Sequence, residues 1–306
     1  MLRDEWSDQW YDFIIGLSHN DWERFWIHHY LSSNSSITWN TIEKHRDEQW
    51  DWDYVCSNPS ISWERILYIN ENIQVCDSRK VSDNVGLTWD IIWSKREIIS
   101  WDWDRIAMNP NVTMNTILST LETSEIPWNY YYVSMNPSIT WDDIQKTHID
   151  WDIQNISKNP NITWDIIQSN PNEKWCWYNI GKNPSITWDV IQSNSNCPWY
   201  YGTIAENPNI TWDIIQSNPT LFSEWDYNMY NPNITPEIVL GSPDKKWDPI
   251  VLAGNSVYKS RERFILKRLQ NLIPNLLGDL MPSISYYLVE YTTLSTKMYD
   301  NIYWNM

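Results

Sequence analysis

The chain has 306 residues, 42% of them hydrophobic and 20% charged, so it can bury a large core and is neither disordered nor membrane-like. Its formal net charge of −17 repels nucleic-acid backbones and anionic membranes and favours a basic partner. Residues 240–306 hold eight of the 22 basic and six of the 39 acidic residues, which leaves 14 basic and 33 acidic residues, a net charge of −19, before position 240.

Residues 1–33 predict two helices that cap one end of a longer structure. Their apolar residues recur at helical spacing, and these are Trp6, Trp10, Phe13, Ile14, Trp22 and Trp26. The first residues contain no apolar run of the kind that forms a signal peptide, and no stretch approaches 18 apolar residues. We therefore expect a cytoplasmic protein that neither enters nor spans a membrane.

Residues 34–256 are a repeat array. The phrase Asn-Pro-Asn/Ser-Ile-Thr-Trp recurs in more or less altered form, and its first Asn is at positions 34, 58, 84, 109, 136, 159, 183, 207, 231 and 255. The period of roughly 24 residues predicts an all-α solenoid of about ten units, because short repeats of this kind bury their apolar faces only by stacking on their neighbours.

Each unit predicts a short helix, a turn, a second short helix and another turn. Thr163 is expected to be the N-cap of the first helix, with Trp164 as its first residue, and Thr187 and Thr211 are expected to cap the equivalent helices. In the ninth unit the tryptophan is replaced by Pro236, and the first helical position is the one that accepts proline. The sequence leaves open whether the second helix is an α-helix or a 3-10 helix.

The repeat resembles the leucine-rich-variant family, whose units carry Asn-Pro-Asn followed by Pro-Glu and aliphatic residues. The match is best at residues 231–239, which read Asn-Pro-Asn-Ile-Thr-Pro-Glu-Ile-Val. The tryptophan-rich form, Asn-Pro-Asn-Ile-Thr-Trp-Asp-Ile-Ile, is similar to repeat proteins of giant DNA viruses of amoebae. The resemblance implies a right-handed superhelix of α and 3-10 helices, and a viral protein that acts in the host cytoplasm.

Tryptophan, with 24 residues, keeps fixed places in the repeat. One set follows the N-cap and a second lies eight residues before the repeated Asn, and we expect both sets in the core. A third row lies six residues before the Asn, and its aromatic members are Trp52, Trp103, Tyr130, Trp177, Tyr201 and Trp225. Positions two apart on a helix point to different sides, so this row is a candidate partner-binding groove, with packing between units as the alternative.

The acidic residues beside this row favour a basic protein or peptide as the partner. Asp51, Asp53, Asp102, Asp104 and Asp226 would surround the aromatic rings, on which lysine or arginine side chains could stack. The same charge disfavours nucleic acid, because stacking energy would have to overcome repulsion along the whole backbone.

The sequence carries no recognisable catalytic or metal-ligand set, so we expect no enzyme, no cofactor and no metal. It has no glycine-rich phosphate loop and no G-x-S-x-G motif, and its five histidines form no ligand cluster. Four cysteines, Cys56, Cys76, Cys176 and Cys197, form no C-x-x-C pair. Reduced thiols are the favoured interpretation, and long-range disulfides are the alternative.

Residues 257–306 predict a second helical cap with leucines at helical spacing. We expect its basic run between residues 259 and 268 to be a solvated helix face, with an acidic partner or self-association as the alternative. The sequence as a whole predicts a non-enzymatic scaffold for protein-protein interaction. The alternatives are an acidic nucleic-acid mimic that sequesters a basic protein and, third, a helical-repeat nucleic-acid glycosylase.

Overall fold

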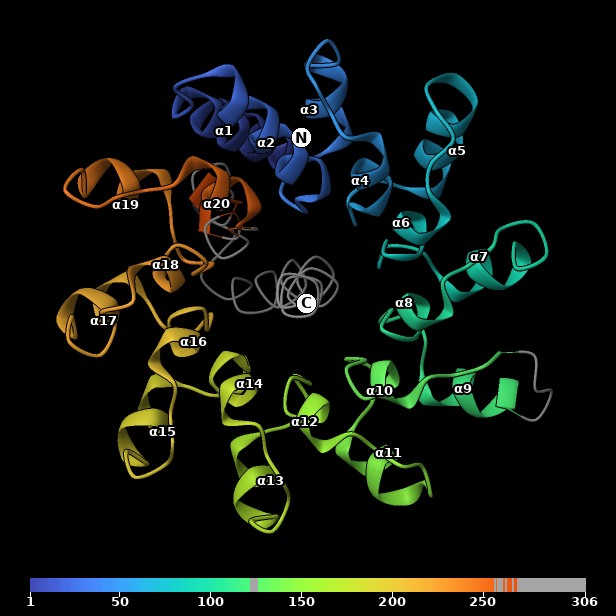
Figure 1. The fold of residues 1–306 in the computed structure, drawn as a ribbon, viewed down its shortest axis with the longest axis vertical. Coiled ribbons are helices and arrows are strands. Elements are labelled where there is room, and N and C mark those ends of the chain that lie inside the picture. Colours follow the sequence, from blue (N-terminus) through green and yellow to red (C-terminus); the bar gives the residue numbers. More distant parts are fainter. Residues whose placement is uncertain (122–125, 256, 258–260, 262, 266, 269–306) are drawn as a thin grey trace, which may run out of the picture.

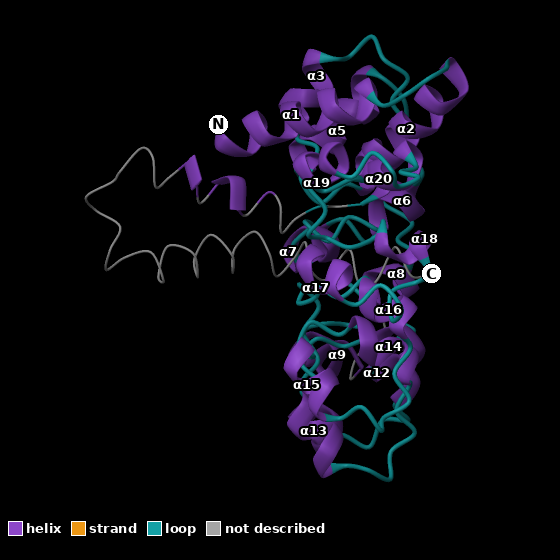
Figure 2. Ribbon diagram, turned by 90° about the vertical axis from the view of Figure 1, so that its left-hand side faces the viewer, coloured by secondary structure: helices purple, strands orange, loops and turns teal. Residues whose placement is uncertain are grey.

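The repeat units stack into a closed ring of helices (Figure 1). The computed structural model describes residues 1–306 except 122–125, 256, 258–260, 262, 266 and 269–306. Within these described residues the regular secondary structure is α-helical, α1 to α20, which confirms the predicted all-α repeat fold and makes the second helix of each unit an α-helix. Figure 2 shows the ring edge-on as a flat slab.

Odd-numbered helices form the outer layer of the ring and even-numbered helices surround its centre (Figure 1). The outer helices are α1 (Leu2–Gly16), α3 (Trp39–Lys44), α5 (Trp63–Asn72), α7 (Trp89–Ser94), α9 (Met114–Leu121), α11 (Trp141–Lys146), α13 (Trp164–Ser169), α15 (Trp188–Ser193), α17 (Trp212–Ser217) and α19 (Pro236–Gly241). The inner helices are α2 (Asp21–Ser33), α4 (Trp52–Ser57), α6 (Ser78–Ser82), α8 (Trp103–Ala107), α10 (Tyr130–Val133), α12 (Ile153–Ile156), α14 (Trp177–Lys182), α16 (Tyr201–Ala205), α18 (Trp225–Asn228) and α20 (Pro249–Gly254).

Local sequence sets where the outer helices begin. The Thr163, Thr187 and Thr211 hydroxyls accept hydrogen bonds from backbone N–H groups three residues later, as the predicted N-caps require. Pro236 is the first residue of α19, also as predicted. These helices have only six residues each, so the array must stabilise them through packing.

Four of the tryptophans eight residues before the repeated Asn close the C-terminal ends of outer helices. The Trp175 indole N–H donates to the carbonyl of Asn170, the C-cap of α13, over 2.9 Å. Trp50, Trp199 and Trp247 make the same bond at α3, α15 and α19. A helix end leaves carbonyls without partners, and tryptophan is the large aromatic residue whose ring N–H can satisfy one.

A ladder of buried asparagines joins one unit to the next. The Oδ1 atom of Asn207 accepts from the N–H of Asn209, which is the turn that the sequence predicts. Its Nδ2 atom also lies within 2.9 Å of the carbonyl oxygens of Gly181 and Asn183 and 3.2 Å from that of Ile186, all in the preceding unit. The repeated Asn therefore connects two units, a role that its position in a turn does not reveal.

The same ladder closes the ring at a seam, which we define as the junction between α20 and α2. Asn34 Nδ2 donates to the carbonyls of Ala253 (2.7 Å) and Asn255 (3.0 Å), as the other ladder residues do within the array. The two helices expected in residues 1–33 are present as α1 and α2, but they lie where the ends of the array meet and not at a free end (Figure 1).

The basic closing segment crosses the seam. Arg261 is only 3% exposed and donates to the carbonyl of Ser35, while Arg263 donates to the side chain of Asn233 on the other side of the seam. The expectation that this run forms a solvated face is wrong for Arg261, because ring closure brings a backbone acceptor to it. Most of the predicted second cap, including its leucine-rich part, lies outside the described residues.

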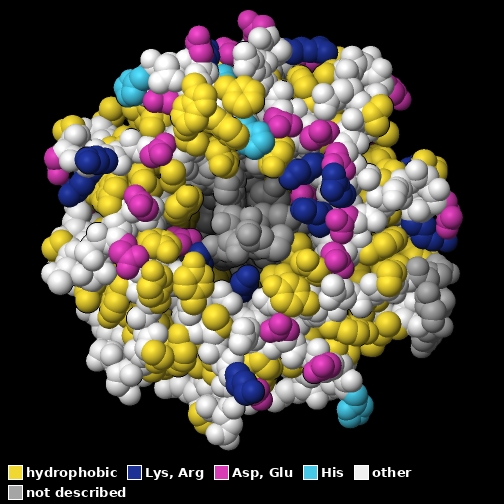
Figure 3. Space-filling model, in the orientation of Figure 1, with side chains coloured by type: hydrophobic (Ala, Val, Ile, Leu, Met, Phe, Trp, Pro, Cys, Tyr) yellow, Lys and Arg dark blue, Asp and Glu magenta, His cyan; other side chains and the backbone are white. Residues whose placement is uncertain are grey.

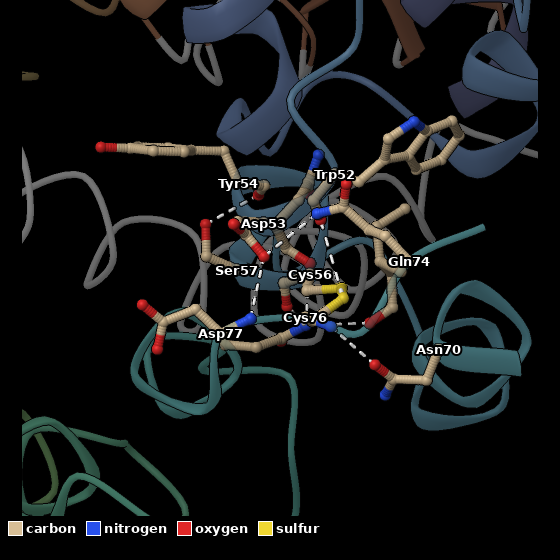
Figure 4. Close-up of a disulfide and its surroundings, with 12 residues drawn as sticks. Trp52, Asp53, Tyr54, Cys56, Ser57, Asn70, Gln74, Cys76 and Asp77 are labelled. Atoms are coloured by element: carbon tan, nitrogen blue, oxygen red, sulfur yellow. Dashed lines mark hydrogen bonds between the residues drawn. A yellow bond between two sulfur atoms is a disulfide. The ribbon is translucent and has the colours of Figure 1, made fainter.

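A disulfide joins two neighbouring inner segments (Figure 4). Cys56 in α4 is bonded to Cys76, which precedes α6, so the expectation of reduced thiols is wrong for this pair. The cysteines are 20 residues apart, close to one repeat period, and stacking of the units brings them together. Beside them, Asp53 accepts from the backbone N–H of Asp77 over 2.8 Å. Cys176 and Cys197 are unbonded and half-buried.

Candidate binding surface on the inner wall

The inner wall of the ring consists of the even-numbered helices α4 to α20 and the residue that precedes each. In α14, Ile180 and Gly181 are buried against neighbouring units, whereas Tyr178, two residues before Ile180, is 45% exposed. Helical periodicity turns this side away from the core, because residues two apart point to nearly opposite sides. Figure 3 shows, on one face of the ring, hydrophobic side chains and charged side chains of both signs among the described residues that surround its centre.

The six predicted groove residues occupy equivalent places but do not line a continuous groove. Each is the first residue of its inner helix, namely Trp52, Trp103, Tyr130, Trp177, Tyr201 and Trp225. All six are half-buried. Their row is interrupted where α6, α12 and α20 begin with Ser78, Ile153 and Pro249.

Five of the six rings pack against an aromatic ring of the following unit. Trp177, for example, contacts Trp199 edge-on at 5.1 Å between ring centroids, and Trp164 completes the cluster at 5.8 Å from Trp199. Equivalent contacts are Trp103–Trp128, Tyr130–Trp151, Tyr201–Phe222 and Trp225–Trp247. The sixth ring, Trp52, packs on the hydrophobic core.

The tryptophans eight and six residues before the Asn do not lie on one helix, as the sequence analysis assumed when it expected them to point apart. In the structure α14 begins at Trp177, and Trp175 precedes the helix with Cys176 between them as the N-cap. The extended residue between the two tryptophans lets both rings reach the packing between units.

A cluster of three tyrosines, Tyr178, Tyr200 and Tyr227, lies further along the inner wall and comes from three consecutive units. Tyr178 and Tyr200 stack with centroids 5.5 Å apart, and Tyr227 meets Tyr200 edge-on at 6.0 Å. The Tyr200 hydroxyl donates to the Glu224 carboxylate over 3.1 Å. Hydrogen bonds to Tyr227 and Glu224 raise the pKa of Tyr200, so this phenol stays protonated.

Basic side chains on the inner wall are already engaged by groups of the same chain. Arg79 pairs with Asp77, Arg105 pairs with Asp83 and Asp102, and Lys182 pairs with Glu206 over 2.9 Å. The ammonium of Lys80 lies 3.9 Å from the centre of the Tyr54 ring, and that of Lys158 lies 3.9 Å from the sulfur of Met135.

Several carboxylates of the inner wall have no such partner. Within the part of the chain that the structure describes, Asp104, Glu224 and Asp226 form no ion pair with a Lys, Arg or His side chain. Burial raises the pKa of Glu206, an effect that the adjacent Lys182 opposes. The surface that remains open to a partner is therefore aromatic and negatively charged.

No protein-family model, curated protein or solved structure matches this chain. The described residues contain no group of three His, Cys, Asp or Glu side chains that could hold a metal ion. Among the same residues, no helix has the length and apolar character needed to cross a membrane.

Sequence reasoning missed the tyrosine cluster because its members do not share one place in the repeat. Relative to the repeated Asn, Tyr178 lies five residues before it, Tyr200 seven and Tyr227 four. A comparison of the units position by position finds the tryptophans, which recur at the same position, and misses residues that do not. The concentration of tyrosines between residues 178 and 230 was the feature of the sequence that could have indicated the cluster.

Proposed function

We propose that the chain is a non-enzymatic scaffold that binds a basic peptide or protein segment on the inner wall of its ring. The observation that carries this proposal is the combination of exposed tyrosines with carboxylates that lack a described cationic partner. Tyrosine offers a large amphipathic contact area at a low cost in side-chain entropy, and nearby carboxylates add attraction for lysine and arginine.

The two alternative functions receive less support from this surface. A glycosylase would need cationic side chains free to hold a nucleic-acid backbone, and the basic residues of the inner wall are engaged with other groups. A nucleic-acid mimic would also bind a basic protein. Its binding would depend on charge and not on the tyrosines. Replacing the tyrosines therefore distinguishes a nucleic-acid mimic from the proposed scaffold, which needs them.

We place this activity in the cytoplasm, the host cytoplasm if the chain is viral as its resemblance implies. Disulfides are rare in cytosolic proteins, so the Cys56–Cys76 disulfide counts against this location, which has to be tested directly. Fractionation of expressing cells, followed by immunoblotting, should find the chain in the cytosolic fraction. Its recovery in a membrane-enclosed compartment would contradict the cytoplasmic location and leave the binding proposal standing.

Binding is tested with two fluorescent nonapeptides, one of arginine and one of glutamate. Fluorescence anisotropy should show that the arginine peptide binds and the glutamate peptide does not. Affinity for the arginine peptide should fall when salt is raised from about 0.05 M to about 0.3 M, because screening weakens exposed charge pairs. Equal binding of the two peptides, or no binding of the arginine peptide, would contradict the proposal.

A further inference from the structure

Three phenol rings and one carboxylate converge on the inner wall between α14 and α18. Tyr178, Tyr200 and Tyr227 are contributed by three successive units, and Glu224 accepts the Tyr200 hydroxyl. The site thus combines an exposed aromatic face, Tyr178 being 45% and Tyr200 36% exposed, with a carboxylate that forms no ion pair within the described chain.

Two glycines allow this convergence. A Cβ atom at Gly202 would lie 2.9 Å from Cε1 of Tyr200 and 3.1 Å from Cδ2 of Tyr227, so a larger residue would push these rings from their places. At Gly181 a Cβ atom would lie 2.8 Å from the Thr203 hydroxyl oxygen. The close packing of α14 against α16 therefore requires glycine at this position. The backbone at Gly202 therefore lies directly against the Tyr200 and Tyr227 rings, and these rings fit there because residue 202 has no side chain.

The charges around the rings favour a cation. Lys182 is held by Glu206 at 2.9 Å while its ammonium lies 5.1 Å from the centre of the Tyr178 ring. Lys245, whose ammonium lies 5.6 Å from the centre of the Trp225 ring, pairs with Asp244. Glu224 and Asp226 follow on the adjacent unit and carry no described counterion. A ligand with several N–H donors would satisfy the remaining carboxylate lone pairs and lie against the exposed ring faces.

We propose that this tyrosine cluster is a subsite for one arginine side chain of the bound peptide. This inference rests on the proposed function, because it names the type of peptide residue that the inner wall binds at this place. A guanidinium is planar, stacks on aromatic rings and donates two parallel hydrogen bonds to a carboxylate, whereas an ammonium is compact and strongly hydrated. The subsite therefore prefers arginine to lysine.

The test compares nonapeptides of arginine and of lysine on the full chain and on two variants. Glu224→Gln removes the charge and keeps the shape, and Tyr200→Phe removes the hydroxyl that positions this carboxylate. Glu237→Gln on α19 is the matched control, since Glu237 is also an exposed carboxylate but lies on an outer helix, away from the inner wall. Dissociation constants come from fluorescence anisotropy.

Glu224→Gln should weaken binding of the arginine peptide about tenfold, since hydrogen bonds to charged groups are the strong ones. It should weaken binding of the lysine peptide by less than about threefold, and Glu237→Gln should change neither. If both cluster variants bind the arginine peptide as the control does, the subsite is wrong and the proposed function stands. If the wild-type chain binds neither basic peptide, the proposed function fails, and the subsite fails with it.

Discussion

Replacing Asn207 by alanine tests the asparagine ladder at a regular position in the ring. Asn207 is fully buried, and its Nδ2 lies within 3.2 Å of three carbonyl oxygens of the preceding unit. Its two amide hydrogens are shared among these carbonyls, and its Oδ1 accepts a further hydrogen bond, from the N–H of Asn209. Alanine removes all of these contacts and takes from the Gly181 carbonyl the donor that Asn207 supplies. The carbonyls of Asn183 and Ile186 keep one donor each, the N–H of Ile186 and the side chain of Asn209.

The amide donates two hydrogens and accepts one, so at about 1 kcal/mol for each lost hydrogen bond the alanine variant should lower the free energy of unfolding by about 3 kcal/mol. Asn207→Asp should cost more than alanine, because a buried carboxylate would face three carbonyl oxygens where the amide donates. Asn172→Ala, in the exposed turn after α13, is the control and should change stability by less than about 0.5 kcal/mol.

Equilibrium urea unfolding followed by tryptophan fluorescence measures these differences from the midpoint and slope of the transition. A loss below about 1 kcal/mol for Asn207→Ala would refute the reasoning, because the ladder would then be an incidental consequence of stacking. A smaller effect of aspartate than of alanine would refute the assigned orientation of the amide, in which nitrogen faces the carbonyls.

Three further predictions use the same unfolding assay. Arg261→Ala should cost about 1–3 kcal/mol and speed backbone hydrogen exchange at the seam, because the Ser35 carbonyl loses its buried donor; unchanged exchange there would contradict this. Trp175→Phe keeps an aromatic ring but loses the N–H that caps Asn170, so it should cost at least about 1 kcal/mol. Burial lowers the pKa of His28, so below about pH 6.5 the folded chain binds fewer protons at this residue than the unfolded chain does. The free energy of unfolding should therefore decrease as the pH is lowered below about 6.5. A His28→Gln variant with the same pH dependence would contradict the assignment to His28.

The candidate site was only partly predictable. Sequence reasoning placed aromatic residues and carboxylates on the second helix of each unit, and both are found on the inner wall. It chose the row of Trp177, which is half-buried in packing between units, and missed Tyr178, the next residue, which is exposed. A shift of one residue turns a helical side chain by about 100°, so an error over where a short helix begins reverses which side chains a partner can reach.

The sequence by itself determined the single unit. Thr187 is the N-cap and Trp188 the first helical residue because these effects act within four residues of one another. Only the tertiary structure decided how the units combine. The hydrogen bond from Asn34 to Ala253 and the Cys56–Cys76 disulfide each join different units, and Arg261 is buried where the two ends of the array meet. Closure of the ring depends on a small rotation between neighbours that accumulates over about ten units. No single unit encodes that sum, so the repeat phrase predicts a solenoid but not that its two ends meet.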